Sequence, residues 1–272
     1  MRLALLVFGG CLTTPLPGAD LSREQHVREQ IEDLHVIGEP LTLSAQGVDF
    51  LGLFIPATVP KPRRRGGLVM LHGLATHPDE GQVIHPLRIH LAEHGWETLA
   101  IQLPLADSEA PVSDYLALIP EALPRIDMAV AFLKQRDISH ILLVGHDLGA
   151  RMGLAYLAAN PPEEVRGLVA LGLATDRQEA TNPTDGVLAP LRKIQQPILD
   201  LYGTRDLPEV LASARDRKIA AQEAHNVGYH QATLPQADHF FRNLTNVLLG
   251  RVRGWLSTIP PLSKPSAGPR KR

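Results

Sequence analysis

The sequence has very little cysteine, few aromatic residues and no long apolar run. Its 272 residues contain one cysteine, Cys11, which excludes an internal disulfide framework and a cysteine-based zinc site. No stretch reaches the roughly 18–20 continuous apolar residues that a membrane-spanning helix needs. The 27 basic and 29 acidic residues nearly balance, so the chain lacks the basic surplus typical of nucleic-acid-binding proteins.

What the chain does contain is the composition of a globular protein: 44% of its residues are hydrophobic and 21% are charged. The first residues have a different character, because Arg2 is followed by the apolar run 3–10 and then by small residues and turn formers that end at Ala19. This pattern predicts a signal peptide over residues 1–19 and therefore a periplasmic or secreted protein. Two alternatives stay open, namely lipoprotein processing at Cys11 and an N-terminal strand of a cytosolic protein. Residues 260–272, rich in proline and basic residues, are expected to form a disordered tail.

Between these ends, strand-like and helix-like patterns alternate. We expect a hairpin at 41–43 and 47–55, strands at 67–72, 97–103, 141–144, 165–171, 198–202 and 229–234, and helices at 82–94, 119–136, 148–160, 207–225 and 240–257. Repeated strand and helix units predict an α/β fold with a mainly parallel, doubly wound sheet and helices on both faces. No internal repeat or linker interrupts the pattern, so we expect one domain over residues 20–259.

The segment Gly145-His146-Asp147-Leu148-Gly149-Ala150-Arg151 lies where an apolar strand meets a helix. Its small residues suit the sharp turn between strand and helix that holds a nucleophile in hydrolases, the pattern G-x-S-x-G. Here aspartate stands in the serine position. The sequence therefore predicts that Asp147 is the nucleophile of such a turn, which we call the elbow.

An acid and a histidine follow in the chain order that this fold uses. Asp206 comes after the strand at 198–202, and His239 comes after the strand at 229–234. We expect Asp206 to orient His239 as the base, the alternatives being a helix-terminal acid and a packing histidine. Backbone N–H groups of Leu74, beside His72, and of Leu148 are the expected oxyanion donors.

These features resemble the α/β-hydrolase superfamily over nearly the whole mature length. More narrowly, His72-Gly73, 76–79, 83–88 and the segment Gly-Trp-Glu-Thr-Leu-Ala-Ile-Gln-Leu-Pro at 95–104 are similar to an exported bacterial family known as domain of unknown function 3530. This resemblance implies the α/β-hydrolase fold and export. It implies little about the substrate.

An aspartate at the elbow favours attack on carbon by displacement, which gives an alkyl-ester intermediate that a water activated by His239 and Asp206 then hydrolyses. That chemistry suits epoxides and carbon–halogen bonds, whereas attack on an ester would give a mixed anhydride. The elbow is similar to that of epoxide hydrolases and haloacid dehalogenases, and Arg151 matches an arginine that can hold a substrate carboxylate there. The alternative for Arg151 is a residue of the first helical turn that pairs with a nearby acid. The chain departs from those enzymes at Leu148, where they have tryptophan or arginine, and between residues 171 and 198, which are too close for a helical cap. We expect a minimal cap or none.

Two other functions remain open. The first is a non-catalytic binding or scaffold protein of the periplasm that keeps the pocket. The second is an ester hydrolase with a non-standard nucleophile. The sequence contains no phosphate-binding glycine loop, and the spacing of His90 and His94 lacks the adjacent glutamate of zinc proteases. We therefore expect no cofactor and no metal, and a small molecule as substrate or ligand. The oligomeric state is not predicted.

Overall fold

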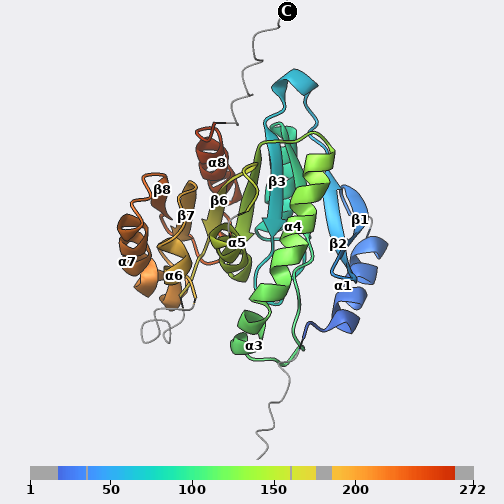
Figure 1. Cartoon of the computed structure of the whole chain (residues 1–272), viewed down its shortest axis with the longest axis horizontal. Helices are drawn as coiled ribbons and strands as arrows, with labels where there is room; N and C mark the ends of the chain where they lie inside the picture. Colours follow the sequence, from blue (N-terminus) through green and yellow to red (C-terminus); the bar gives the residue numbers. More distant parts are fainter. Residues whose placement is uncertain (1–17, 35, 160, 176–185, 261–272) are drawn as a thin grey trace, which may run out of the picture.

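A computed structural model of the chain describes residues 18–34, 36–159, 161–175 and 186–260. The predicted tail beyond residue 260 and almost all of the predicted signal peptide lie outside the described residues. Within them, eight strands form one sheet in the order β1-β2-β4-β3-β5-β6-β7-β8 (Figure 1). The strands are β1 (Glu39–Ala45), β2 (Val48–Ile55), β3 (Gly66–Leu71), β4 (Trp96–Ile101), β5 (Ile141–His146), β6 (Val165–Leu171), β7 (Ile198–Gly203) and β8 (Tyr229–Leu234).

The first two strands form an antiparallel hairpin, and β2 joins β4 in antiparallel register. All the other strand pairs are parallel. The central strands β4, β5 and β7 have every residue buried, because a parallel sheet is covered by helices on both faces. This burial explains why they appear in the sequence as continuous apolar runs.

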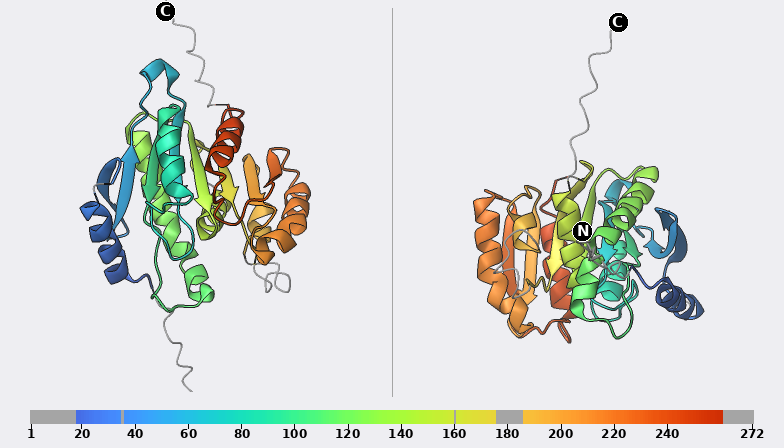
Figure 2. Two further views of the ribbon diagram at one scale, coloured as in Figure 1. Left: turned by 180° about the vertical axis from the view of Figure 1, so that it is seen from behind. Right: turned by 60° about the horizontal axis from the view of Figure 1, so that its bottom comes forward.

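Helices cover the two faces of the sheet and enclose two hydrophobic cores. One face carries α3 (Val112–Ala117), α4 (Ile119–Gln135), α5 (Leu148–Ala158), α6 (Leu188–Leu191) and α7 (Pro208–Glu223), and the other carries α2 (Ile84–Glu93) and α8 (Thr245–Leu256). The view from behind shows α2 and α8 in front of the sheet (Figure 2). The first helix, α1 (Leu21–Asp33), packs beside the β1 end. A short 3-10 turn, Lys61–Arg63, lies between β2 and β3.

The predicted α/β-hydrolase architecture is confirmed by this sheet, and three helices were not predicted: α1, α3 and α6. The prediction for the last helix was wrong at its start, because α8 begins at Thr245 and not at residue 240. Phe241 and Asn243 have φ angles of 54° and 61°, and a right-handed helix cannot run through such left-handed residues. Between β6 and β7 the described residues contain one helix, the four-residue α6. Of the helices described, none is both long and apolar enough to cross a membrane.

Candidate active site

Asp147 occupies a strained turn between β5 and α5. Its backbone has φ 50° and ψ −116°, and a residue with a Cβ atom rarely adopts a positive φ. The flanking glycines allow the close packing of this turn. A Cβ atom on Gly149 would lie 2.3 Å from the Leu71 carbonyl oxygen, and one on Gly145 would lie 2.6 Å from the backbone of Ala150. The elbow predicted from the sequence is therefore present in the structure.

Asp206 and His239 meet at the carboxyl ends of β7 and β8. The His239 Nδ1 atom donates to Asp206 Oδ1 at 2.6 Å. The same carboxylate also accepts from the N–H groups of Gly203, at 3.1 Å, and Leu207, at 2.8 Å. These bonds fix the carboxylate. Since a carboxylate only accepts, His239 keeps its proton on Nδ1 and leaves the Nε2 lone pair free to act as a base.

The imidazole of His239 points to Asp147. His239 Nε2 lies 4.0 Å from Asp147 Oδ2, beyond the range of about 2.6–3.2 Å for a direct hydrogen bond but within reach through one water. Gly172, with φ 60°, allows this approach, because a Cβ atom on it would lie 2.8 Å from His239 Cε1. The structure therefore brings Asp147, Asp206 and His239 together, as the sequence predicts.

The charges of this group shift its pKa values. Burial lowers the pKa of His239, but the hydrogen bond to Asp206 and the charge of Asp147 outweigh burial, so that the pKa lies above its ordinary value. Burial raises the pKa of Asp206, but the bonds from His239 and Gly203 outweigh it and the pKa falls below the ordinary value. The carboxyl group of Asp206 therefore stays ionised at neutral pH, beside the ring of His239.

The expected oxyanion donors lie beside Asp147. The Leu74 N–H donates to Asp147 Oδ2 at 3.1 Å. Leu148 is the first residue of α5, so its N–H has no acceptor within the helix. One carboxylate oxygen of Asp147 thus accepts from the first of the two expected donors.

His72 holds the backbone that follows β3 and leads to Leu74. Its Nδ1 donates to the Gly73 carbonyl oxygen at 2.9 Å, and its Nε2 accepts from the Leu103 N–H at 3.0 Å. Burial lowers the pKa of His72 to about 3, so the ring is neutral at physiological pH. Both ring nitrogens are therefore engaged within the protein, and His72, which the sequence groups with the oxyanion and substrate-binding residues, supports the backbone next to Leu74.

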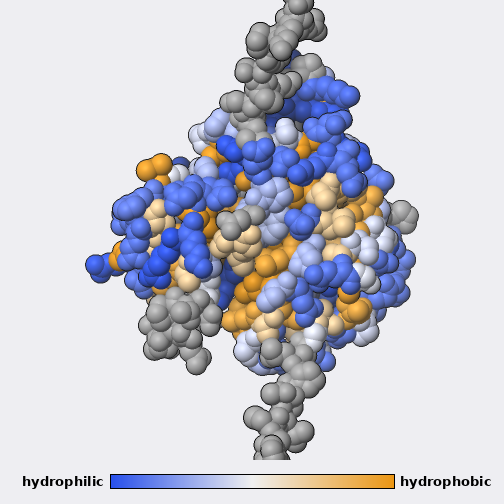
Figure 3. Space-filling view, in the orientation of Figure 1, coloured by the Kyte–Doolittle hydropathy of each residue, from blue (hydrophilic) through white to orange (hydrophobic). Residues whose placement is uncertain are grey.

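Arg151 does not contact the Asp147 carboxylate. Among the described residues, the polar partners of that carboxylate are Leu74 and His239. The Arg151 side chain lines a hollow of about 250 Å³ between α4, α5 and α6, together with Ile119 and Lys193. Apolar surface gathers beside α4 and α5 on this side of the molecule (Figure 3). Arg151 therefore lies on the flank of the elbow helix.

Two site residues were not predicted. The His146 Nε2–H donates to the His239 carbonyl oxygen at 3.0 Å, and the two rings lie 4.8 Å apart. Phe240 packs edge-on against His239 at 5.2 Å. The position of His146 directly before Asp147 was the only signal in the sequence, and it does not reveal the partner.

Within the described part of the chain, no group of three or more His, Cys, Asp or Glu side chains is placed to hold a metal ion.

Comparison with known families assigns the chain to a family of unknown function. The sequence matches the family described as "Protein of unknown function (DUF3530)" over residues 13–124 and 117–258. The chain belongs to the DUF3530 family. A comparison with curated protein sequences found no significant match.

Solved structures similar to this DUF3530 protein are α/β-hydrolases. An esterase of Pyrococcus furiosus is 15% identical with a TM-score of 0.66, and the match covers 84% of this chain and 93% of the esterase. A dienelactone hydrolase of Anabaena variabilis is 19% identical with a TM-score of 0.62, over 81% and 97% of the two chains. A lidless α/β serine hydrolase of Xanthomonas campestris is 15% identical with a TM-score of 0.61, over 83% and 96%. Identities this low show the α/β-hydrolase fold alone.

Proposed function

We propose that the protein is a hydrolase of small molecules in which Asp147 attacks a carbon atom of an epoxide or a carbon–halogen bond. One observation carries this proposal. Asp147 Oδ2 accepts from the Leu74 N–H, while His239 Nε2 is 4.0 Å away and not hydrogen-bonded to it. A nucleophilic serine needs a direct bond to its base. A nucleophilic carboxylate is already ionised and needs the base only for the later attack of water.

In the first step, Asp147 Oδ1 forms a bond to the substrate carbon while Oδ2 stays with Leu74. The carbon–halogen bond breaks and halide leaves, or the epoxide carbon–oxygen bond breaks and the alkoxide takes a proton from water. The product of this step is an ester between Asp147 and the substrate. Its carbonyl oxygen lies at the N–H groups that stabilise an oxyanion.

In the second step, His239 Nε2 takes a proton from a water molecule, and the resulting hydroxide adds to the Asp147 carboxyl carbon. Negative charge develops on Oδ2 beside the Leu74 N–H. When the tetrahedral intermediate collapses, the bond between the carboxyl carbon and Oδ1 breaks, so that Oδ1 leaves in the product alcohol, which takes the proton from His239. Asp147 is left as a carboxylic acid with one oxygen atom from water, and it returns to the carboxylate by losing its remaining proton to solvent. Asp206 stabilises the protonated imidazole throughout.

The experiment uses that exchange of oxygen. The purified protein turns over styrene oxide or chloroacetate in water enriched in heavy oxygen, and the peptide that contains Asp147 is then weighed. We expect heavy oxygen in Asp147 and not in Asp216, an exposed aspartate on α7 that serves as the internal control. His239→Gln should accumulate the alkyl ester on Asp147, because the ester forms but is not hydrolysed. Asp147→Asn should give neither label nor adduct.

The alternatives give other results. A non-catalytic binding protein would show no label, no adduct and no product with any of these probes. An ester hydrolase with another nucleophile would cleave p-nitrophenyl acetate in the Asp147→Asn variant. In addition, Asp147→Ser should acquire hydrolysis of p-nitrophenyl acetate that is lost in the Asp147→Ser, His239→Ala double variant, since the base and the oxyanion donors are in place. A folded Asp147→Ser protein without that activity would contradict the assembled site.

We further propose that the protein is exported and that residues 1–19 are removed as a signal peptide. The sequence pattern supports this, and so does the position of α1, which begins directly after the expected cleavage position with Asp20 as its N-cap. Cleavage there removes no described helix or strand. N-terminal sequencing of protein from its natural host should find Asp20 first, and an intact Met1 on the cytosolic protein would refute export.

A further inference from the structure

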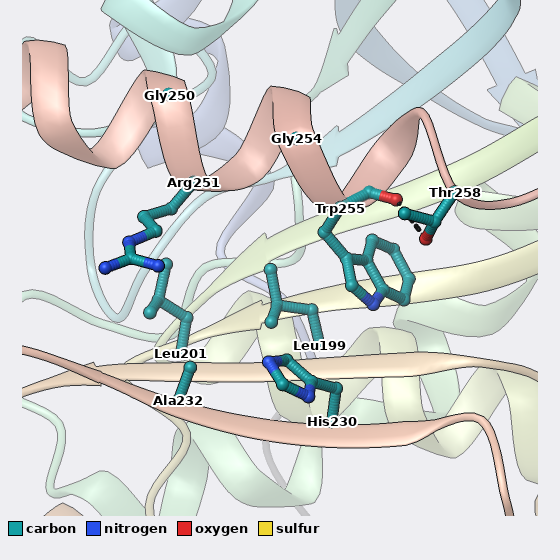
Figure 4. Close-up of a pocket in the computed structure, with 9 residues that line it drawn as sticks. All are labelled: Leu199, Leu201, His230, Ala232, Gly250, Arg251, Gly254, Trp255 and Thr258. Atoms are coloured by element: carbon teal, nitrogen blue, oxygen red, sulfur yellow. Dashed lines mark hydrogen bonds between the residues drawn. The ribbon is translucent and has the colours of Figure 1, made fainter.

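The last two strands carry a hollow of about 500 Å³ on the face that α8 covers in part (Figure 4). Parallel strands need cover on both faces. On the opposite face α7 packs over β7 and β8, and a buried Asp200–Arg217 pair joins α7 to β7. On the α8 face, Leu199 and Leu201 of β7 stand beside His230 and Ala232, their partners in register on β8. These four residues form the floor of what we call the α8 hollow.

The wall of the α8 hollow is a stretch of α8 with small residues. Gly250 and Gly254 are four residues apart and therefore lie on one side of the helix. Both line the hollow, and a Cβ atom on either would meet nothing within 4 Å, so the glycines leave the hollow open on this side. The half-buried Trp255 closes one end, with its indole directed from α8 towards Leu199 (Figure 4). The space thus has a floor of two leucines, an alanine and His230, and an aromatic wall.

The α8 hollow is lined by basic and neutral residues. Of the nine residues that line it, none is acidic. Thr258 Oγ1 donates to the Trp255 carbonyl oxygen at 2.7 Å and is engaged. Arg251 reaches from α8 towards the floor (Figure 4), and among the described residues no carboxylate lies within 4 Å of its guanidinium. Its neighbour Arg253 is hydrogen-bonded to His94, so Arg251 is the cation that the hollow offers.

We propose that the α8 hollow binds a hydrophobic carboxylate, with its apolar body between Trp255 and the leucine floor and its carboxylate on Arg251. The volume, the apolar lining and a single charged group match the usual make-up of a small-molecule site. An arginine pairs well with a carboxylate, because its planar donors fit both oxygens. The chain beyond residue 260 is a poor occupant, since it carries Lys264, Arg270, Lys271 and Arg272 and no acidic residue.

The site differs from the one at Asp147. Leu199 and Leu201 lie within β7, whereas Asp206 follows its carboxyl end. The proposal therefore does not depend on whether the elbow is catalytic, and a binding measurement tests it directly.

The test is calorimetric titration of the full-length protein with octanoate and with octanamide, which has the same chain but no charge. We expect octanoate to bind with one site per chain and octanamide to bind about tenfold more weakly. Arg251→Gln should remove this difference, so that both bind alike. The matched control Arg253→Gln, on the same helix but outside the hollow, should leave both affinities unchanged.

A second variant tests the space itself. Gly254→Leu should fill the α8 hollow and abolish the binding of both compounds while leaving the circular dichroism spectrum and melting curve of the native protein. The proposal is overturned if octanoate does not bind at concentrations up to about 10 mM, because a specific small-molecule site should bind more tightly than that. It is equally overturned if binding survives both Arg251→Gln and Gly254→Leu, or if binding is lost in His239→Ala instead, which would place octanoate at the elbow.

Discussion

Replacing Asp147 by alanine and by glycine should reverse the usual order of stability of these two residues. The backbone of Asp147, at φ 50° and ψ −116°, lies outside even the small left-handed helical region that residues with a Cβ atom visit. Holding such a residue in a sparsely populated region costs about 1–3 kcal/mol. Glycine escapes that cost but loses about 0.5–1 kcal/mol more conformational entropy on folding than alanine. The glycine variant should therefore be the more stable, by up to about 2.5 kcal/mol.

The difference in unfolding free energy between the alanine and glycine variants reports the backbone strain, because both variants lose the same side-chain interactions. Neither keeps the hydrogen bond from Leu74 or the charge that faces His239, so the contribution of the carboxylate cancels in the difference. Only the Cβ atom distinguishes them. The free energy of unfolding of each variant follows from urea titration monitored by circular dichroism.

The control is Ala212→Gly in α7, an exposed helical position. There glycine should be less stable than alanine by about 0.5–1 kcal/mol. If glycine at position 147 lowers stability by a similar amount, the turn is not strained. The argument that the fold holds Asp147 as the nucleophile of an elbow then fails, because the strained turn is what presents that side chain above the sheet.

Four further predictions concern the elbow turn, the buried pair between α7 and β7, and His239. Gly149→Ala places a Cβ atom 2.3 Å from the Leu71 carbonyl oxygen, so urea titration should show a loss of about 3 kcal/mol or more. Arg217→Met removes the arginine that pairs with the buried Asp200 carboxylate, which keeps only neutral donors from Tyr229 and Gln231 among the described residues, and should cost about 3–5 kcal/mol by the same assay. Asp206→Asn should lower the pKa of His239, measured by NMR titration, because the Asp206 hydrogen bond helps to raise it. Since that pKa is raised in the folded protein, the protonated His239 stabilises the fold most at pH values below its unfolded pKa. This stabilisation is lost as the pH rises through the folded pKa. The rate of the proposed hydrolysis should rise over the same pH range, because the base must be unprotonated.

Local sequence patterns were sufficient for most of the sheet. Each central strand is covered on both faces, so its apolar run is visible without knowledge of its neighbours. The first helix was missed because its sequence, Leu-Ser-Arg-Glu-Gln-His-Val-Arg-Glu-Gln-Ile-Glu-Asp, has few apolar residues. A buried ion pair holds it instead: Arg125 of α4 binds Glu24 at 2.7 Å, across 101 positions of the chain. A periodicity argument cannot detect a contact of that kind.

The candidate site, like the fold, could be predicted from the sequence only in part. Asp147, Asp206 and His239 each follow a predicted strand, and the carboxyl ends of parallel strands meet at one edge of a sheet, so their convergence could be predicted. The roles of His72 and His146 could not be predicted, since they depend on partners 31 and 93 positions away. Histidine serves equally as a base, a ligand or a packing residue, and only the atoms around its two nitrogens decide among these.

The first helix links the proposed export to the proposed chemistry. Arg23 of α1 donates to the carbonyl oxygens of Ala106, at 2.7 Å, and Ala75, at 3.4 Å, and Ala75 directly follows the oxyanion donor Leu74. The Asp20 N–H donates to Leu105 at 2.7 Å, and the Asp20 carboxylate accepts from the N–H of Arg23. After cleavage behind Ala19, the new terminal amine of Asp20 keeps a hydrogen to donate to Leu105, and its positive charge lies beside its own carboxylate. Removal of the proposed signal peptide should therefore preserve α1 and its hydrogen bond to the loop of the expected oxyanion donor Leu74.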